Sequence, residues 1–226
     1  MKNGHNLTEL AEMPIGRLLW KYSLPAVAGM LVMQLYSIID RIFIGQVVGP
    51  EAIAGLAITF PVMNITTALG VLVGAGASAR ASLFLGSGND RMARLVLGNA
   101  LTLTLVIGIV YLSLFAWGMD TVLGWFGANE VTLPYARDFM MYILPGLLLT
   151  NITFTFNNLM RASGFPVRAM VTMFIGAGLN IILAPVFIYV LDLGIKGAAV
   201  ATDISMTVSA IFVMNHFFHK KNGPVT

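Results

Sequence analysis

The sequence predicts an all-α, polytopic membrane protein built as a six-transmembrane-helix bundle. Three observations support this prediction. The chain has 226 residues, of which 58% are hydrophobic and only 10% are charged, whereas about a quarter of a soluble domain is charged. Its mean hydropathy is +0.85. Six stretches carry few or no charges, and each is long enough to cross a hydrocarbon core about 30 Å thick, which takes about 20 helical residues.

The six predicted spans follow one another with short connections that leave no room for a soluble domain. They are Leu18–Val48, Ala52–Ala79, Leu95–Met119, Tyr135–Met160, Ala169–Leu191 and Gly197–Phe218. Glycine, proline, asparagine and serine mark the turns between them. We therefore expect residues 1–16 to form a cytoplasmic N-terminal segment, residues 17–219 to form one transmembrane lobe, and residues 220–226 to begin a linker to a second lobe.

Proline and glycine residues inside the spans predict where helices bend and where they pack closely. Four prolines lie inside them, namely Pro25, Pro61, Pro145 and Pro185. Each removes a backbone donor and bends its helix, which is tolerated where neighbouring helices or water satisfy the freed carbonyls. Gly70 and Gly74 form a GxxxG pair that permits close helix approach. This pair indicates either tight packing inside the bundle or a moving interface.

The distribution of Lys and Arg predicts the orientation, because these residues are more frequent in cytoplasmic loops. Most of the thirteen lie at the two termini, between the second and third spans, or between the fourth and fifth. The opposite side has only Arg41, Arg137 and Lys196. We therefore expect a multi-pass protein of the cell (inner) membrane with both termini cytoplasmic.

The sequence also argues against several classes of function. Zero cysteines exclude disulfides, thiolate metal sites and a cysteine nucleophile. The motifs of phosphate-binding loops, zinc proteases and nucleophile elbows are missing, so we expect neither an enzyme nor a cofactor. The basic residues flank the spans, and we therefore expect a lipid bilayer rather than nucleic acid as the partner.

Asp40 is the first candidate functional residue, because it lies inside the first span. A carboxylate at that depth costs at least about 2.5 kcal/mol and usually serves a function. Tyr36 is four residues earlier on the same helical face, with Met33 and Ser37 flanking it. Such a group can bind and release H⁺ or Na⁺ as its exposure changes. The alternative is a structural Asp near the outer interface, paired with Arg41 or with a loop.

Other polar residues in the spans are candidates of the same kind. Asn157 and Asn180 need hydrogen-bond partners in hydrocarbon, which other helices can supply. Thr202 and Asp203 lie in the sixth span. Asp203 either faces a cavity or pairs with Arg161 or Arg80 toward the cytoplasmic end.

Several short motifs follow one another along the chain in a set order. They are Leu24-Pro25, Ile39 to Gly45, Ala54 to Ala57, Phe60-Pro61, Leu85 to Asn89, Arg161 to Gly164, Asn180 to Ile188 and Gly197 to Thr202. In this order and spacing they resemble the amino-terminal half of a multidrug and toxic compound extrusion (MATE) transporter of the bacterial and archaeal type. The resemblance covers roughly Met13 to His219.

The resemblance implies twelve helices in two six-helix lobes, which rock to expose a central cavity to either side. It implies export of small organic cations or amphipathic drugs in exchange for H⁺ or Na⁺. The family's ion site in the amino-terminal lobe corresponds to Asp40, Tyr36, Asn157, Asn180 and Thr202. Asp203 is added from its position, and Met33 and Met63 are predicted to line the substrate cavity.

Two departures from the family pattern qualify this prediction. Ala184 stands where the pattern Asn-x-x-x-Asp-Pro places a second acid. Either Asp40 acts alone, or Asp203 substitutes for that acid, or coupling is altered or absent. The chain also stops where the linker between lobes would begin. We therefore expect the partner to be a second six-helix lobe or an identical copy.

Two other functions remain open from the sequence. A flippase for lipid-linked saccharides shares the wider superfamily's architecture, but it would want cationic residues deep in the spans, and few are present. A non-transporting or truncated membrane subunit is the other alternative, favoured by Ala184.

Overall fold

The computed structural model describes residues 13–218, so the predicted boundaries at 1–16 and 220–226 lie largely outside the described residues. The prediction of an all-α bundle is confirmed: the described residues form helices and turns without strands. The elements are α2 (Ile15–Val47), α3 (Pro50–Gly86), α4 (Asp90–Trp125), α5 (Leu133–Ala162), α6 (Pro166–Pro185), the π-helical turn η1 (Val186–Val190) and α7 (Gly194–Phe218). In this range, six helical spans are long and apolar enough to cross a membrane.

Several helices extend beyond the predicted spans, because the prediction stopped at charged residues. α3 continues past Arg80 to Gly86, and α4 continues past Asp120 to Trp125. Backbone hydrogen bonding does not require apolar side chains, and long charged side chains at helix ends reach toward water. α4 is kinked at Gly118, which has non-helical φ/ψ of −132° and 22°. The side chain of Asn89 caps the start of α4 by accepting from the Met92 N–H at 3.1 Å.

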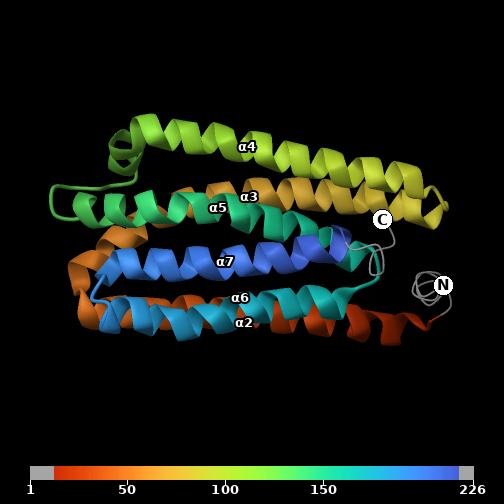
Figure 1. Ribbon diagram of the computed structural model, residues 1–226, viewed down its shortest axis with the longest axis horizontal. Coiled ribbons are helices and arrows are strands. Elements are labelled where there is room, and N and C mark those ends of the chain that lie inside the picture. The colour runs from red at the N-terminus through yellow and green to blue at the C-terminus, as the bar shows by residue number, and fades with distance from the viewer. Residues whose placement is uncertain (1–12, 219–226) are drawn as a thin grey trace.

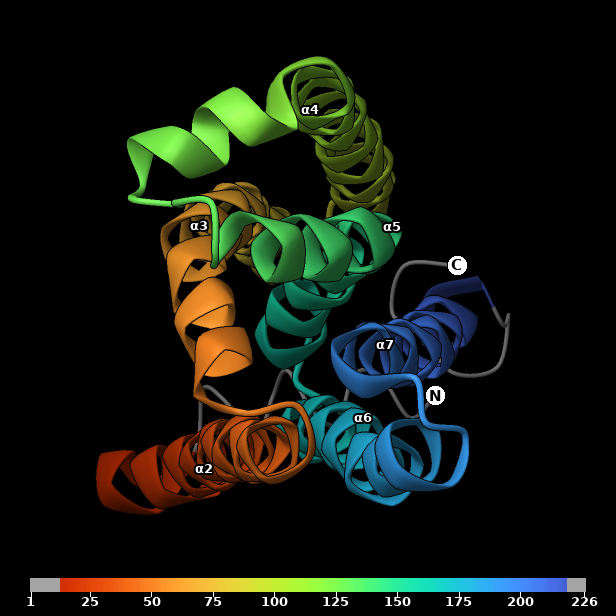
Figure 2. The ribbon, with the colours of Figure 1, turned by 90° about the vertical axis from the view of Figure 1, so that its left-hand side faces the viewer.

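The helices surround α5, which packs against α3, α4, α6 and α7. α4 lies at one edge of the bundle beside α3 and α5, whereas α2 lies at the opposite edge against α6 (Figure 2). The start of α2 and the end of α7 lie at the same end of the bundle, here called the terminal end (Figure 1). The opposite end, called the far end, holds the connections after α2, α4 and η1.

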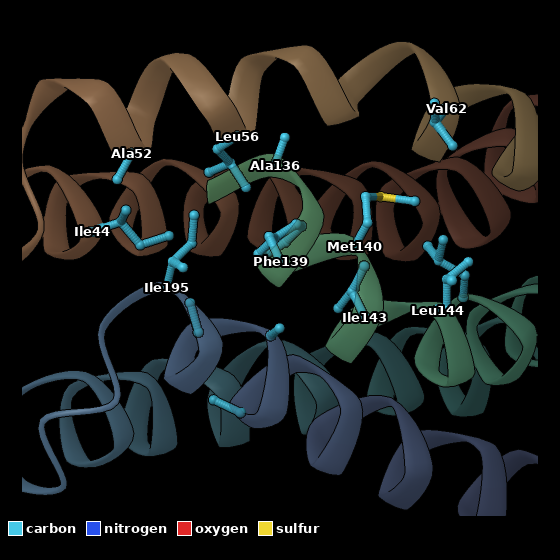
Figure 3. Packing of buried hydrophobic residues seen from close by; sticks show 14 of the residues in the cluster. Ile44, Ala52, Leu56, Val62, Ala136, Phe139, Met140, Ile143, Leu144 and Ile195 are labelled. Carbon is cyan, nitrogen blue, oxygen red and sulfur yellow. The ribbon is translucent and has the colours of Figure 1, made fainter. Parts of the chain in front are cut away.

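The largest apolar core lies toward the far end, where α2, α3, α5 and α7 meet (Figure 3). Its members include Ile44, Leu56, Phe139, Ile143 and Ile195, all at most 6% exposed. A second core toward the terminal end includes Phe156 and Phe217, whose rings pack edge to face with centroids 5.3 Å apart. Both cores include residues of α5.

The GxxxG pair of α3 lies against α5. A Cβ at Gly70 would come within 3.0 Å of the Asn151 Cα, and a Cβ at Gly74 within 2.9 Å of the Thr155 Cα. The Thr155 hydroxyl donates to the Gly70 carbonyl at 3.1 Å and lies 3.2 Å from the Thr104 hydroxyl of α4. The structure thus supports the packing interpretation of this motif, since side chains would separate the helices.

Candidate functional site

Asp40 lies in a pocket formed where α2 meets α3, α5 and α7. Tyr36 and Asp40 are one turn apart on α2, as their spacing predicts. The pocket, here called the Asp40 pocket, is lined by Tyr36, Ser37, Asp40, Arg41, Leu56, Phe60, Met63, Phe139, Ile143 and Thr202. Four predicted site residues therefore meet there: Asp40, Tyr36, Thr202 and Met63.

One oxygen of the Asp40 carboxylate lacks a hydrogen-bond partner. Its Oδ1 is buried and makes no hydrogen bond within residues 13–218. Arg41 does not pair with it; the guanidinium instead lies 4.0 Å from the centroid of the Phe60 ring and contacts the Ser37 hydroxyl at 3.4 Å. A buried carboxylate oxygen without a partner is costly, so this oxygen is available to a ligand that enters the pocket.

Asn180 reaches the Asp40 pocket through Thr202. The side chain of Asn180 is 1% exposed, and its Nδ2 donates to the Thr202 hydroxyl at 2.9 Å. That hydroxyl donates in turn to the Ala198 carbonyl at 3.0 Å. The two bonds fix the Thr202 oxygen at the pocket wall, which joins α6 and α7 to the site.

Asn157 and Met33 lie in a different cavity, nearer the terminal end. This cavity, here called the Asn157 cavity, is lined by Met33, Thr150, Thr153, Phe154, Asn157, Thr172, Met173, Gly176, Met206 and Ser209. Asn157 Nδ2 donates to the Ala169 carbonyl at 2.9 Å, whereas its Oδ1 is buried without a partner among the described residues. Asn157 therefore does not line the pocket that holds Asp40.

Asp203 also lies outside the lining of the Asp40 pocket. Its Oδ1 occupies the space that a Cβ at Gly146 of α5 would fill. The structure gives no ion pair between Asp203 and either Arg161 or Arg80; Arg161 instead contacts the Met173 sulfur at 3.2 Å. Ala184 is 1% exposed within the far-end core. Asp203 and Ala184 thus occupy different helices and different surroundings.

Two groups of pocket-lining residues were not predicted from the sequence. Arg41 lines the Asp40 pocket although it is adjacent to Asp40 in sequence, because its long side chain reaches Phe60. The hydroxyls of the Asn157 cavity were also missed. Their signal was the spacing of Thr150, Thr153 and Asn157, which places polar groups on one face of α5.

Comparison with known proteins identifies the family. The MatE family model matches residues 25–186, which is most of the chain. The chain belongs to the MatE family. An FAD transporter of Shewanella oneidensis is 35% identical over 213 residues, covering 92% of this chain and 46% of that protein. The multidrug export protein MepA of Staphylococcus aureus is 29% identical over 212 residues, covering 94% of this chain and 47% of that protein.

Solved MATE structures share the fold. A crystal structure of MATE in the bent conformation superposes with a TM-score of 0.84 at 31% identity, covering 90% of this chain and 45% of that chain. A transporter of the MOP superfamily from Pyrococcus furiosus gives a TM-score of 0.86 at 31% identity, with 92% and 46% covered. This MatE chain therefore spans about half the length of the relatives it matches. It is a multi-pass membrane protein of a transporter family and not an enzyme.

Proposed function

We propose that this chain is one six-helix half of a cation-coupled efflux transporter in which Asp40 exchanges the coupling ion, H⁺ or Na⁺. The observation that carries the proposal is the buried, unpartnered Asp40 Oδ1 in a pocket shared by four helices. A purely structural carboxylate at membrane depth would be expected to pair with a cation or a donor. The adjacent Arg41 is directed to Phe60 instead.

The neighbouring oxygens suit a small cation. Tyr36 and Thr202 present hydroxyl groups to the same pocket, and Asn180 orients the Thr202 hydroxyl. A bound cation would draw Asp40 of α2 toward these oxygens and so favour one position of α2 against α7. Release of the cation would remove that attraction. This difference in interaction free energy between two positions is what coupling requires.

The exported substrate in this proposal is a small organic cation or amphipathic drug. One relative is named as a multidrug export protein and another as an FAD transporter, which supports transport of an organic molecule. Phe60 and Met63 line the Asp40 pocket, and Met33 lines the Asn157 cavity. Methionine and aromatic side chains adapt to ligands of different shape.

A second six-helix lobe, on the same polypeptide or an identical copy, completes the transporter in this proposal. Gln34 of α2 and Asn64 of α3 are exposed side chains within spans. An amide facing hydrocarbon would leave its hydrogen-bonding groups unsatisfied, so this face is expected to meet protein or water. The Lys and Arg distribution supports a cytoplasmic position for the terminal end in this proposal.

The competing function is a membrane subunit that assembles with a partner and transports nothing. The observation that favours it is Ala184, an apolar side chain buried in the far-end core at the position of the family's second acid. Alanine cannot hold a proton or a sodium ion. This alternative predicts a folded chain in which Asp40 can be neutralised without consequence.

Transport by the reconstituted chain separates these functions. Proteoliposomes are given an H⁺ or Na⁺ gradient, and efflux of ethidium or of FAD is followed. We expect ion-driven efflux that Asp40→Asn abolishes and that Glu130→Gln leaves unchanged, because Glu130 is exposed in the connection between α4 and α5. Efflux that persists in Asp40→Asn would refute Asp40 coupling, and its absence when the unaltered chain is reconstituted together with its second lobe would favour the subunit.

A further inference from the structure

The Asp40 pocket and the Asn157 cavity follow one another along the bundle in the same order on three helices. On α2, Met33 lines the Asn157 cavity, and Tyr36 and Asp40 line the Asp40 pocket. On α7, Met206 and Ser209 line the Asn157 cavity, and Thr202 lines the Asp40 pocket.

α5 repeats this order. Thr150 and Thr153 line the Asn157 cavity, whereas Ile143 and Phe139 line the Asp40 pocket. Because α5 and α7 run from the far end to the terminal end and α2 runs the opposite way, the two spaces are stacked along the membrane normal. The Asn157 cavity is the one nearer the terminal end, because its α5 residues lie closer to the C-terminal end of that helix.

Asp203 lies in the layer between these two spaces. Its carboxylate abuts Gly146 of α5, which is three residues from Ile143 and four from Thr150. At 1.5 Å per residue, Gly146 lies about 4.5 Å along α5 from the level of Ile143 in the Asp40 pocket and about 6 Å from the level of Thr150 in the Asn157 cavity. On its own helix, Asp203 follows Thr202 of the Asp40 pocket directly and precedes Met206 of the Asn157 cavity by three residues.

The local packing leaves one oxygen of this carboxylate buried inside the bundle without a hydrogen-bond partner. Asp203 Oδ1 is buried and makes no hydrogen bond within residues 13–218. It fits because Gly146 has no side chain; any Cβ there would overlap the oxygen. The hydroxyls one turn away are already donating, Thr150 to the Gly146 carbonyl at 2.8 Å and Thr207 to the Asp203 carbonyl at 2.7 Å.

From this arrangement we propose that Asp203 is a proton relay between the Asn157 cavity and the Asp40 pocket. The inference rests on the proposed function and adds the path by which a proton reaches or leaves Asp40. Asp203 takes a proton from water in the Asn157 cavity and becomes a neutral carboxylic acid. It then gives that proton through water at the Thr202 hydroxyl to the Asp40 carboxylate and returns to the charged form.

A proton fits this position better than a metal cation does. One free carboxylate oxygen is enough to hold a proton, whereas a metal ion needs several converging oxygen ligands, and the described residues contain no group of three or more acidic or histidine side chains that could hold one. The hydroxyls of the Asn157 cavity donate to backbone carbonyls, as Thr153 does to Leu149 and Thr172 to Arg168. Their free lone pairs can therefore accept hydrogen bonds from water that carries the proton.

The other titratable groups on the surrounding helices lie away from Asp203. Asp138 of α5 pairs with Lys196 of α7 at 3.1 Å, and Tyr142 lies beside Lys196. Toward the terminal end, Arg168 of α6 contacts His216 of α7 at 2.9 Å. Arg137 of α5 pairs with Asp120 of α4 at 3.2 Å, and Arg161 of α5 lies beside Met173. Tyr36, Asp40 and Arg41 of α2 lie in the Asp40 pocket.

The first test detects the proton on Asp203 without measuring transport. Infrared difference spectra of the full chain in lipid are recorded on acidification in H₂O and D₂O, where a shielded carboxyl group exchanges slowly. We expect Asp203→Asn to remove one slowly exchanging carboxyl band that Asp40→Asn and Glu130→Gln both retain. Spectra of Asp203→Asn that keep every such band would overturn the proposal.

The second test measures the relay itself. In proteoliposomes under a proton gradient, Asp203→Asn should slow ion-driven efflux about tenfold, or about 1.4 kcal/mol in the barrier, with Asp203→Glu recovering most of the rate. Gly146→Ala should also slow efflux, because its Cβ displaces the carboxylate, whereas Gly178→Ala has open space on α6 and should not. A normal efflux rate in Asp203→Asn overturns the relay even if Asp40→Asn is inactive. A normal efflux rate in Asp40→Asn overturns both the relay and the proposed function.

Discussion

α5 and α2 differ strongly in the share of their residues that is buried. α5 buries Phe156, Leu159 and Met160 to 1% exposure or less, together with Asn151 and Asn157, whereas α2 buries only Gly29 and Ile44 in its 33 residues. The helix that carries Asp40 is therefore the one that packing holds least. The fold is anchored on α5, while α2 can change position at a modest cost in stability.

Truncating the α5 core should give the largest effect. Phe156→Ala removes a ring that is 1% exposed and packs against Phe217, and we expect a loss of about 3 to 5 kcal/mol in unfolding free energy. Leu31→Ala on α2, where the side chain is 58% exposed, should cost less than about 0.5 kcal/mol. Thermal unfolding in detergent measures both, and equal losses would contradict the contrast between the helices.

Crowding the α3–α5 contact should come next. Gly74→Leu forces a side chain against the Thr155 backbone and should cost about 3 kcal/mol. Gly76→Leu is the matched control two residues away, since nothing lies within 4 Å of its Cβ position. Unfolding temperature and size-exclusion profiles compare the two. A stable Gly74→Leu protein would mean that the helices can separate without penalty.

Removing the hydroxyl that Asn180 contacts should lower both stability and transport. Thr202→Val keeps the side-chain shape but leaves Asn180 Nδ2 without its acceptor, at a cost of about 1 to 3 kcal/mol. We expect ion-driven efflux to fall about tenfold, with Thr202→Ser as the control that restores it. Unchanged efflux would show that Thr202 serves only to bond Asn180.

Labelling should distinguish the two exposed faces with almost no effect on stability. The chain has no cysteine, so single cysteines can be introduced without background. Asn64→Cys on α3 should react with a water-soluble maleimide in membranes, because we expect that face to border the transport path. Ile109→Cys on α4, where the side chain is 59% exposed, should face lipid and stay unlabelled. Equal reactivity would remove the assignment of the α3 face.

The sequence predicts the fold well because the bilayer imposes one rule on every span. Only closed backbone hydrogen bonding survives in hydrocarbon, so apolar length alone indicates six helices. The ends of α3 and α4 were misplaced since helices continue through charged turns such as those at Arg80 and Asp120. The kink at Gly118 has no unique signal, because most glycines in this chain lie in regular helix.

The site was predictable in part for the same reason. Tyr36 and Asp40 share one helix, so their spacing fixed their common face. Asn157 does not line the Asp40 pocket because it lies near the terminal end of α5, whereas Asp40 lies near the far end of α2; counting residues from each helix end shows this difference in depth. The positions of Asp203 and Arg41 depend on Gly146 and Phe60, which lie on other helices.

The stacking of Arg41 on Phe60 has a consequence for selectivity. One face of an aromatic ring attracts one cation, and the guanidinium already lies over a face of Phe60 at 4.0 Å. An organic cation drawn to Asp40 would therefore meet a resident competitor. Weakly charged or strongly hydrated cations gain too little from the ring to displace the guanidinium, whereas broad, polarisable cations can displace it. The pocket would therefore select cations that resemble a guanidinium group in shape and charge distribution.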